Sequence, residues 1–396
     1  MPPDRETVLR EILSTIEPPA SGITAAGLLQ EGRRARRRRR QWYTASAAGA
    51  VTFGLVVTAG LVGRTGTVPS PQAGASTPAA APGCTAERLT LPPNTNEGGV
   101  NAASPDGRHL AGAVTGPGNP ALPVRWDGTR AVPIPIDGTG EATGVNDSGV
   151  AVGRGQTAGH QHYAWAYAGG KVVKLPVPKG YTGAEASAVN AAGQVAGVLF
   201  AGEHNAAVVW QSATADAGVT VLDAPGGAMA FGISDEGVVV GGLETGAAYR
   251  WDANGRGSKL AGPAGTDGGS GALGVRGDWV YGLLTKSEPS AGDKTAFPGG
   301  TVIDPNVAVL WNLATGKAGT VDDGRVEAIS PTGQITVNGK DGTASIRQAS
   351  GESRPLPPLT AGAKAYAYAL SDDGTLAGGA SADRPVRWSC AAEGNR

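Results

Sequence analysis

One short phrase recurs along most of the chain: Ser or Asn, two variable residues, Gly, and then a short apolar run. Six copies are present, namely SPDGRHLAG at 104, NDSGVAVG at 146, NAAGQVAG at 190, SDEGVVVG at 234, SPTGQITV at 330 and SDDGTLAG at 371. A shortened copy, VRGDWVYG, starts at 275, and the turn glycines lie 40 to 56 residues apart. A period of this length indicates a repeat architecture.

Each repeat supplies four short strands. The Ser or Asn oxygen accepts a backbone hydrogen bond two residues on, and the Gly supplies positive φ, so the phrase predicts a hairpin between the first two strands. A third piece ends in Trp, and a fourth follows, as in KVVKLPVP. Seven such units predict an all-β fold, a seven-bladed β-propeller of four-stranded blades. Six or eight blades follow if the fifth unit or the closure is divided differently.

A tryptophan ends the third piece of every unit except the sixth, which has TASIRQ instead. A large ring in each unit buries much apolar area in a chain with 5% aromatic residues, so we expect blade-to-blade packing and not ligand binding. The predicted packing residues are Trp126, Trp165, Trp210, Trp251, Trp311 and Trp388.

The two cysteines of the chain stand at the two ends of the repeat region. The last unit stops one strand short, after RPVRWSC, while CTAERLTLPP at residues 84 to 93 precedes the first unit and is similar to a fourth strand. If these segments pair, the N-terminal strand closes the ring and removes exposed sheet edges. Cys84 and Cys390 then form a disulfide across the closure, which requires an oxidising compartment.

The region before Cys84 predicts a membrane anchor. Seven arginines between Arg33 and Arg40 precede the uncharged stretch 42–63. At about 1.5 Å per residue this helix extends about 33 Å, enough to cross a hydrocarbon core of about 30 Å. The arginines place the N-terminus in the cytoplasm by the positive-inside rule. We therefore expect a single-pass protein of the cell membrane, with residues 84–396 outside the cell.

Other interpretations of the region before Cys84 have less support. A cleaved signal peptide conflicts with the long preceding segment 1–41 and with the absence of a small-x-small cleavage site. Topology and anionic lipid explain the arginines without nucleic acid, which is not an expected partner. Residues 4–16 have helical apolar spacing, and residues 64–83 form a Pro/Ala/Ser-rich linker. Without His or Cys before Cys84, a zinc-binding anti-sigma domain is excluded.

With the phrases aligned, residues 84–396 resemble the extracellular HAF-repeat proteins of bacteria. Their pattern is A-x-G-I-N-x-x-G-x-V-x-G followed by H-A-F/Y-x-W and a strand that contains Leu. The second unit, ATGVNDSGVAVG with HYAW after it, matches best, whereas the first, third and seventh units lack the His and aromatic residue. The resemblance implies an extracytoplasmic propeller-like domain and no particular chemistry.

Residues of the kind that carry chemistry are sparse. No GxSxG, HExxH, P-loop, calcium-loop or CxxC motif occurs, and no cofactor is expected. His160, His162, Glu203 and His204 fall between the second and third strands of neighbouring units, so a small metal site is conceivable there. The simpler interpretation is that they are exposed loop residues.

Three further features have simple structural explanations. The fifth unit has an insertion, 284–306, that either covers the channel mouth or is a surface excursion. Arg276, Gly277 and Asp278 spell a cell-adhesion tripeptide but occupy a turn, and the acidic NDSG, SDEG and SDDG phrases are turn formers. The equivalent first-strand positions that would line the channel are taken as Ala, Thr, Gly and Val.

These observations favour a binding or scaffold module for an envelope protein, glycan or peptide. An envelope enzyme, a lyase or hydrolase at the channel mouth, is the alternative, but it should bring titratable residues together on the channel. A transmembrane signalling component that uses residues 4–40 is a third hypothesis. The sequence leaves open whether the protein is an enzyme, and it names no catalytic residue.

Overall fold

The computed structural model describes residues 83–202, 204–263, 269–285, 307–321, 324–348 and 351–391. These residues belong to one compact unit, Gly74–Arg396. They form 28 strands in seven four-stranded antiparallel sheets, and each sheet is one blade. The all-β, seven-bladed propeller expected from the repeat is therefore confirmed.

Blades 1 to 4 run in chain order from the innermost to the outermost strand. Blade 1 is β2 (Glu97–Ala103), β3 (His109–Gly116), β4 (Asn119–Asp127) and β5 (Arg130–Pro133); blade 2 is β6 (Thr139–Val145), β7 (Ala151–Gln156), β8 (His162–Ala168) and β9 (Lys171–Lys174). Blade 3 is β10 (Gly183–Val189), β11 (Val195–Ala201), β12 (His204–Trp210) and β13 (Val219–Val221); blade 4 is β14 (Ala228–Ile233), β15 (Val239–Leu243), β16 (Ala248–Trp251) and β17 (Gly257–Lys259).

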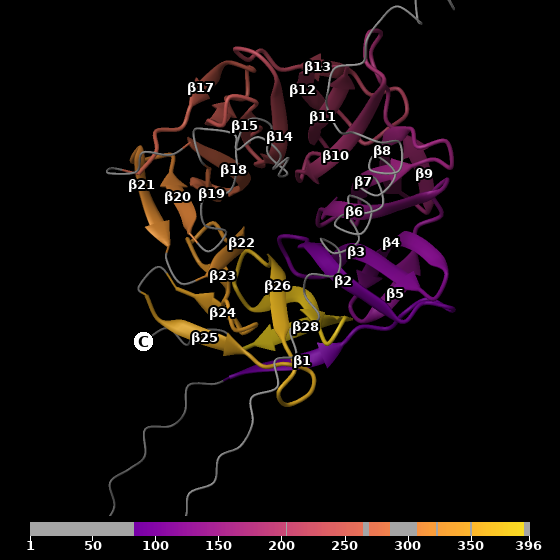
Figure 1. The fold of residues 1–396 in the computed structure, drawn as a ribbon, viewed down its shortest axis with the longest axis vertical. Coiled ribbons are helices and arrows are strands. Elements are labelled where there is room, and N and C mark those ends of the chain that lie inside the picture. Colours follow the sequence, from indigo (N-terminus) through magenta and orange to yellow (C-terminus); the bar gives the residue numbers. More distant parts are fainter. Residues whose placement is uncertain are drawn as a thin grey trace, which may run out of the picture. The chain divides into compact units, whose positions relative to one another are not determined.

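Blades 5 and 6 have the same order, whereas blade 7 takes its outermost strand from the other end of the domain. Blade 5 is β18 (Gly269–Arg276), β19 (Trp279–Thr285), β20 (Ala308–Asn312) and β21 (Lys317–Val321); blade 6 is β22 (Arg325–Ile329), β23 (Ile335–Asn338), β24 (Ala344–Arg347) and β25 (Ser353–Leu356). Blade 7 is β26 (Ala365–Leu370), β27 (Leu376–Ser381), β28 (Arg384–Cys390) and β1 (Cys84–Arg88). Figure 1 shows the sheets following one another around a ring, with the first strands nearest the centre.

The repeated phrase forms the hairpin between the first two strands of each blade. In blade 2, Asn146 Oδ1 accepts the N–H groups of Ser148 and Val150, and Gly149 has φ 70°. The Asn146 amide also donates to the Asn190 carbonyl of blade 3, at 3.0 Å, and Asn190 donates in the same way to Ser234 of blade 4. The first residue of the phrase therefore makes the turn and joins it to the next blade.

Five of the repeat tryptophans also join neighbouring blades through the indole N–H. Each donates at 2.7 to 2.8 Å to a carbonyl just after the outermost strand of the preceding blade: Trp126 to Thr90, Trp210 to Pro176, Trp251 to Asp223, Trp311 to Ala261, and Trp388 to Pro357. Their side chains are at most 3% exposed. The hydrophobic clusters likewise combine two blades, as where Val152 and Ala164 of blade 2 pack with Trp210 of blade 3. The predicted blade-to-blade packing is confirmed.

The sixth tryptophan, Trp165, is buried but lies two residues out of register. Trp126, Trp210 and their equivalents pair with the beginning of the second strand, whereas in blade 2 that position is paired with Tyr167, and Trp165 pairs with Gly153. The Trp165 indole nitrogen has no hydrogen-bond partner among the described residues. Aligning HYAW with the other repeat endings therefore identified the burial of Trp165 correctly and its register incorrectly.

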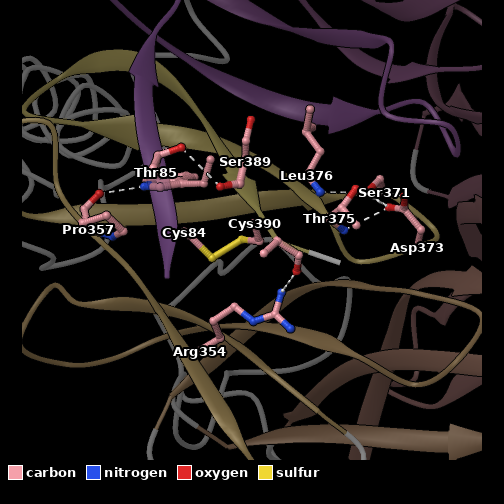
Figure 2. The surroundings of a disulfide bond; sticks show 12 residues. Cys84, Thr85, Arg354, Pro357, Ser371, Asp373, Thr375, Leu376, Ser389 and Cys390 are labelled. Atoms are coloured by element: carbon pink, nitrogen blue, oxygen red, sulfur yellow. Dashed lines mark hydrogen bonds between the residues drawn. A yellow bond between two sulfur atoms is a disulfide. The ribbon is translucent and has the colours of Figure 1, made fainter. Parts of the chain in front are cut away.

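The ring closes as the sequence predicts, with the N-terminal strand in the last blade. β1 pairs antiparallel with β28 from Cys84↔Cys390 to Arg88↔Val386. The two cysteines form a disulfide with a Cα–Cα distance of 4.1 Å and a sequence separation of 306 residues. Figure 2 shows this bond beside Thr85 and Ser389, with Arg354 donating to the nearby carbonyl of Ala391.

Several predicted features lie outside the described residues. They include the segment 1–41, the expected transmembrane helix 42–63, nearly all of the linker 64–83, and residues 286–306 of the insertion, which falls between β19 and β20 as expected. Among the described residues, no helix has the length and apolar character needed to span a membrane.

Replacing both Cys84 and Cys390 with Ala should lower the free energy of unfolding without changing the fold. A cross-link over this separation contributes on the order of 5 kcal/mol in the chain-entropy account, because it restricts the unfolded chain. Guanidinium unfolding of the oxidised wild type and the double variant measures the difference. Equal midpoints would show that the disulfide does not stabilise the closure.

Trp210→Phe should destabilise the protein by about 1 to 3 kcal/mol more than Trp165→Phe. Both substitutions shrink a buried ring, but the first also leaves the Pro176 carbonyl without its donor, whereas the second removes a donor that has no partner in the described part of the chain. Thermal and denaturant melts of the two variants test this. An equal loss would mean that the indole hydrogen bond contributes nothing.

Candidate functional site

Every first strand carries a β-bulge, and the extra residue lines a cavity at the centre of the ring. The register shifts once in each of the seven pairs between a first and a second strand. In six blades one residue of the first strand is skipped, and in blade 6 Glu327 and Ala328 stand opposite one skipped residue of the second strand, Thr336. The skipped residues of the other blades are Asn101, Thr143, Ser187, Phe231, Leu273 and Tyr368. All seven blades contribute to this central cavity of about 130 Å³.

In six blades a glycine of the second strand leaves room for the first strand beside the bulge. A Cβ on Gly197 would lie 2.1 Å from the Glu185 carbonyl oxygen, and a Cβ on Gly241 would lie 1.9 Å from that of Met229. The first strand therefore approaches where a side chain would stand, as is common where Gly occurs inside a strand. Blade 6 has Val337 at this position and a net register shift of one residue as well, so the bulge also forms without the glycine.

The bulge adds residues to the expected channel wall. Ala, Thr, Gly and Val do line the cavity, as Ala102, Thr143, Gly144 and Val145 show. The bulged residues beside them are mostly larger and differ in chemistry, as in Phe231 and Tyr368. The signal that could have located them is the glycine of the second strand.

Two of the polar bulged residues bind the next blade. The Asn101 amide donates to the Ala142 carbonyl at 3.0 Å and to Glu141 at 3.3 Å. The Thr143 hydroxyl donates to the Ala186 carbonyl at 2.9 Å. The Ser187 hydroxyl has no hydrogen-bond partner among the described residues, although it lines the central cavity. The polar side of the cavity therefore keeps unused hydrogen-bonding capacity.

The ionisable groups at the central cavity are paired. Burial raises the pKa of Glu327, and its partner Arg325 opposes that rise. Burial, followed by the nearby Glu327 carboxylate, raises the pKa of Tyr281 as well. Arg276 Nε lies 3.7 Å from Asp372, where burial raises the carboxyl pKa and Arg276 lowers it. No unpaired charge faces the cavity from the described residues that line it.

A second polar cluster joins blades 2 and 3. Arg154 binds Glu141 and lies 3.4 Å from Glu185, whose other oxygen lies 2.8 Å from His162 Nδ1. Because a carboxylate can only accept, Nδ1 donates to Glu185. Nε2 lies 3.0 Å from the Gln156 amide nitrogen, so both ring nitrogens of His162 have a polar neighbour.

The four candidate metal ligands do not form one site in the described structure. His160 lies in a turn with φ 62°, His162 binds Glu185, and His204 Nδ1 lies 2.8 Å from Glu244, while Glu203 is outside the described residues. Within the described ranges no three His, Cys, Asp or Glu side chains are placed to hold a metal ion. The exposed-loop interpretation holds for His160, and the other two histidines join neighbouring blades.

The acidic turns act as turn formers and also connect blades. Asp147 accepts the Asp106 N–H at 2.9 Å, and Asp235 accepts the Ala191 N–H at 2.8 Å. Gly277, in the middle of the adhesion-like tripeptide, has φ 52° in the hairpin between β18 and β19. These positions are therefore explained by the backbone.

Comparison with known proteins supports the fold. A streptogramin B lyase structure matches with a TM-score of 0.51 and 12% identity over 78% of this chain and 98% of that chain. A catalytically inactive virginiamycin B lyase from Staphylococcus aureus with quinupristin matches with a TM-score of 0.50 and 11% identity over 78% of this chain and 100% of that chain. At such identities the likeness shows a shared fold alone.

At the level of sequence, the chain has no match in two further comparisons. No protein-family model matches it, and no curated protein does. The HAF-repeat resemblance therefore stays a prediction.

Glu327→Gln should gain stability relative to the wild type as pH rises above the ordinary pKa of a glutamate. A carboxyl whose pKa is raised on folding binds more protons folded than unfolded, so wild-type stability falls as pH rises from the unfolded pKa through the folded pKa. The Gln variant has no such loss. Denaturant unfolding at pH 4 and pH 7 measures the change, with the exposed Glu236→Gln as control. A stability difference between Glu327→Gln and the wild type that does not change with pH would contradict it.

Proposed function

We propose that the protein is a binding module whose central cavity recognises an envelope protein, glycan or peptide. The observation that supports this proposal most is the difference in residue type between the bulged position and the positions on both sides of it. The residue before the bulge is Val or Ala in all seven blades, and the residue after it is Ala or Gly, whereas the bulged residue is Asn, Thr, Ser, Phe, Leu, Glu or Tyr.

Where the seven blades place a residue in the same structural role, the sequence keeps nearly the same residue, as the small residues on both sides of the bulge show. Seven different side chains at one repeated backbone position give the cavity a distinct chemistry on each side, as a specific ligand site requires. Because Glu327 is paired with Arg325 and Arg276 with Asp372, recognition explains the wall better than catalysis does.

The disulfide and the arginines support a location outside the cytoplasm. A bond between Cys84 and Cys390 persists in an oxidising compartment, and the arginine-rich segment followed by residues 42–63 favours a single span with the N-terminus inside. In this proposal the propeller is displayed at the outer surface of the membrane. Signalling through residues 4–40 is compatible with it and has no support of its own.

Photo-crosslinking in intact cells tests the binding function. Replacing Tyr368 or Phe231 of the full chain with the photoreactive residue p-benzoylphenylalanine places the reactive group in the central cavity. The same replacement at Val221, on the outermost strand of blade 3, is the control, because Val221 is 42% exposed and far in the sheet from the first strand. We expect both cavity positions, and not Val221, to give the same adduct. No adduct from either, or an equal adduct from Val221, would contradict the proposal.

A further inference from the structure

Neighbouring blades meet at seven joints, and one of these joints differs from the rest. Between blades 5 and 6, no hydrogen bond or ion pair joins the residues that the structure describes. Each of the other six joints has at least one hydrogen bond: Asn101 to Ala142 (blades 1 and 2), Thr143 to Ala186 (2 and 3), Asn190 to Ser234 (3 and 4), Ser270 to Gly246 (4 and 5), Asn338 to Ala367 (6 and 7) and Gly98 to Asp383 (7 and 1).

The same joint lacks the aromatic donor that the other six contain. Five of those donors are the repeat tryptophans, and between blades 1 and 2 the Tyr163 hydroxyl donates to the Asp137 carbonyl. In blade 6, Arg347 holds the tryptophan position, because it pairs with the beginning of the second strand. Beside it, the Gln348 amide nitrogen is buried without a hydrogen-bond partner among the described residues. Blade 6 therefore has polar side chains where the other blades have a ring.

Apolar packing alone holds this joint, and it includes no fully buried ring. Each of the other six hydrophobic clusters contains a buried tryptophan, whereas Trp279 is only partly buried against the cluster between blades 5 and 6. The buried members of that cluster are Ala308, Val326, Ile329, Ile335 and Val337. Small aliphatic side chains bury less apolar area than an indole, so the joint is weaker.

The inner part of the joint contains groups that are costly to bury. Burial raises the pKa of Glu327 in blade 6, and burial, followed by the Glu327 carboxylate, raises the pKa of Tyr281 in blade 5. Both groups would regain water if the blades separated, so their desolvation opposes closing. The ion pair of Arg276 with Asp372, 3.7 Å apart, connects blade 5 to blade 7, but it is partly exposed and such pairs contribute little.

We infer that the ring opens reversibly between blades 5 and 6 while its other six joints stay closed. Proteins open locally where their contacts are least stable, and this joint has the fewest kinds of contact in the ring. Because β18 and β22 both contribute to the wall of the central cavity, the open joint gives that cavity an entrance from the side. The inference is independent of the proposed binding function, since it rests on the contacts between blades.

Thiol labelling of two matched cysteine variants of the full chain tests this inference. Val326 and Val100 both precede the bulge of a first strand and are both 0% exposed, but Val326 packs between blades 5 and 6, and Val100 packs with Trp126. Iodoacetamide without reductant leaves the native disulfide intact, and intact mass counts the added groups. We expect Val326→Cys to be labelled at least about tenfold faster than Val100→Cys, because two hydrogen bonds fewer hold its joint. Equal rates would overturn the inference.

Hydrogen exchange on the unsubstituted full chain is the second measurement, and it needs no variant to fold. The amides of β22 and β23 should exchange by local opening, at least about tenfold faster than those of β10 and β11 at the same place in blade 3. Exchange of both pairs of strands at one rate, that of global unfolding, would contradict a local opening.

Arg347→Trp tests whether the missing ring is the cause. An indole at this position should slow the labelling of Val326→Cys about tenfold and leave that of Val100→Cys unchanged. Arg347→Ala, which removes the charge without adding a ring, is the control and should not slow labelling. If the tryptophan has no effect, or if the alanine slows labelling equally, the assignment of the weak joint to the missing ring is wrong.

Discussion

The pairing of β1 with β28 is the constraint on which the rest of this structure depends. A ring of sheets has no free ends only if its last blade is completed, and here the two strands that complete it come from opposite ends of the domain. The disulfide fixes that pair at Cys84 and Cys390. With the ring closed, the seven first strands face one another, and their bulged residues share a single cavity.

Between the blades, the repeat uses the same contacts many times over. The turn Asn or Asp residues, the indole N–H groups and the small apolar residues each join one blade to the next. Each such hydrogen bond contributes on the order of 1 kcal/mol net, so the stability of the ring comes from their number. A chain with few aromatic residues can therefore build a large β domain, because each blade completes the core of its neighbour.

Much of the fold could be predicted from the sequence, because the same pattern of four strands recurs in seven units. The repeat period and the turn glycines predicted the blades, because they follow from local turn chemistry. The closure was predicted because the last unit lacks one strand and a similar strand precedes the first unit. The register within a blade was less accessible. In the sequence Trp165 aligns with the other repeat tryptophans, yet in the pairing of β7 with β8 it is Tyr167 that occupies their position.

The candidate site was hidden for a related reason. One extra residue in a strand reverses which side chains face the centre, and periodicity alone does not reveal it. With the bulge, Asn101, Ser187 and Phe231 line the cavity together with the small residues that follow them. For the histidines between the second and third strands the simpler interpretation was exposed loop residues, and nothing in the sequence indicated their partners. His162 and His204 each contact a glutamate of the next blade, Glu185 and Glu244.

Mapping the disulfide in full-length protein isolated from the cells that produce it tests the closed ring and its proposed extracytoplasmic location most directly. After alkylation without reductant and proteolysis, mass spectrometry should find the Cys84 peptide joined to the Cys390 peptide, and reductant should separate them. Two alkylated thiols in the isolated protein would contradict both the covalent closure and the placement of the propeller outside the cytoplasm.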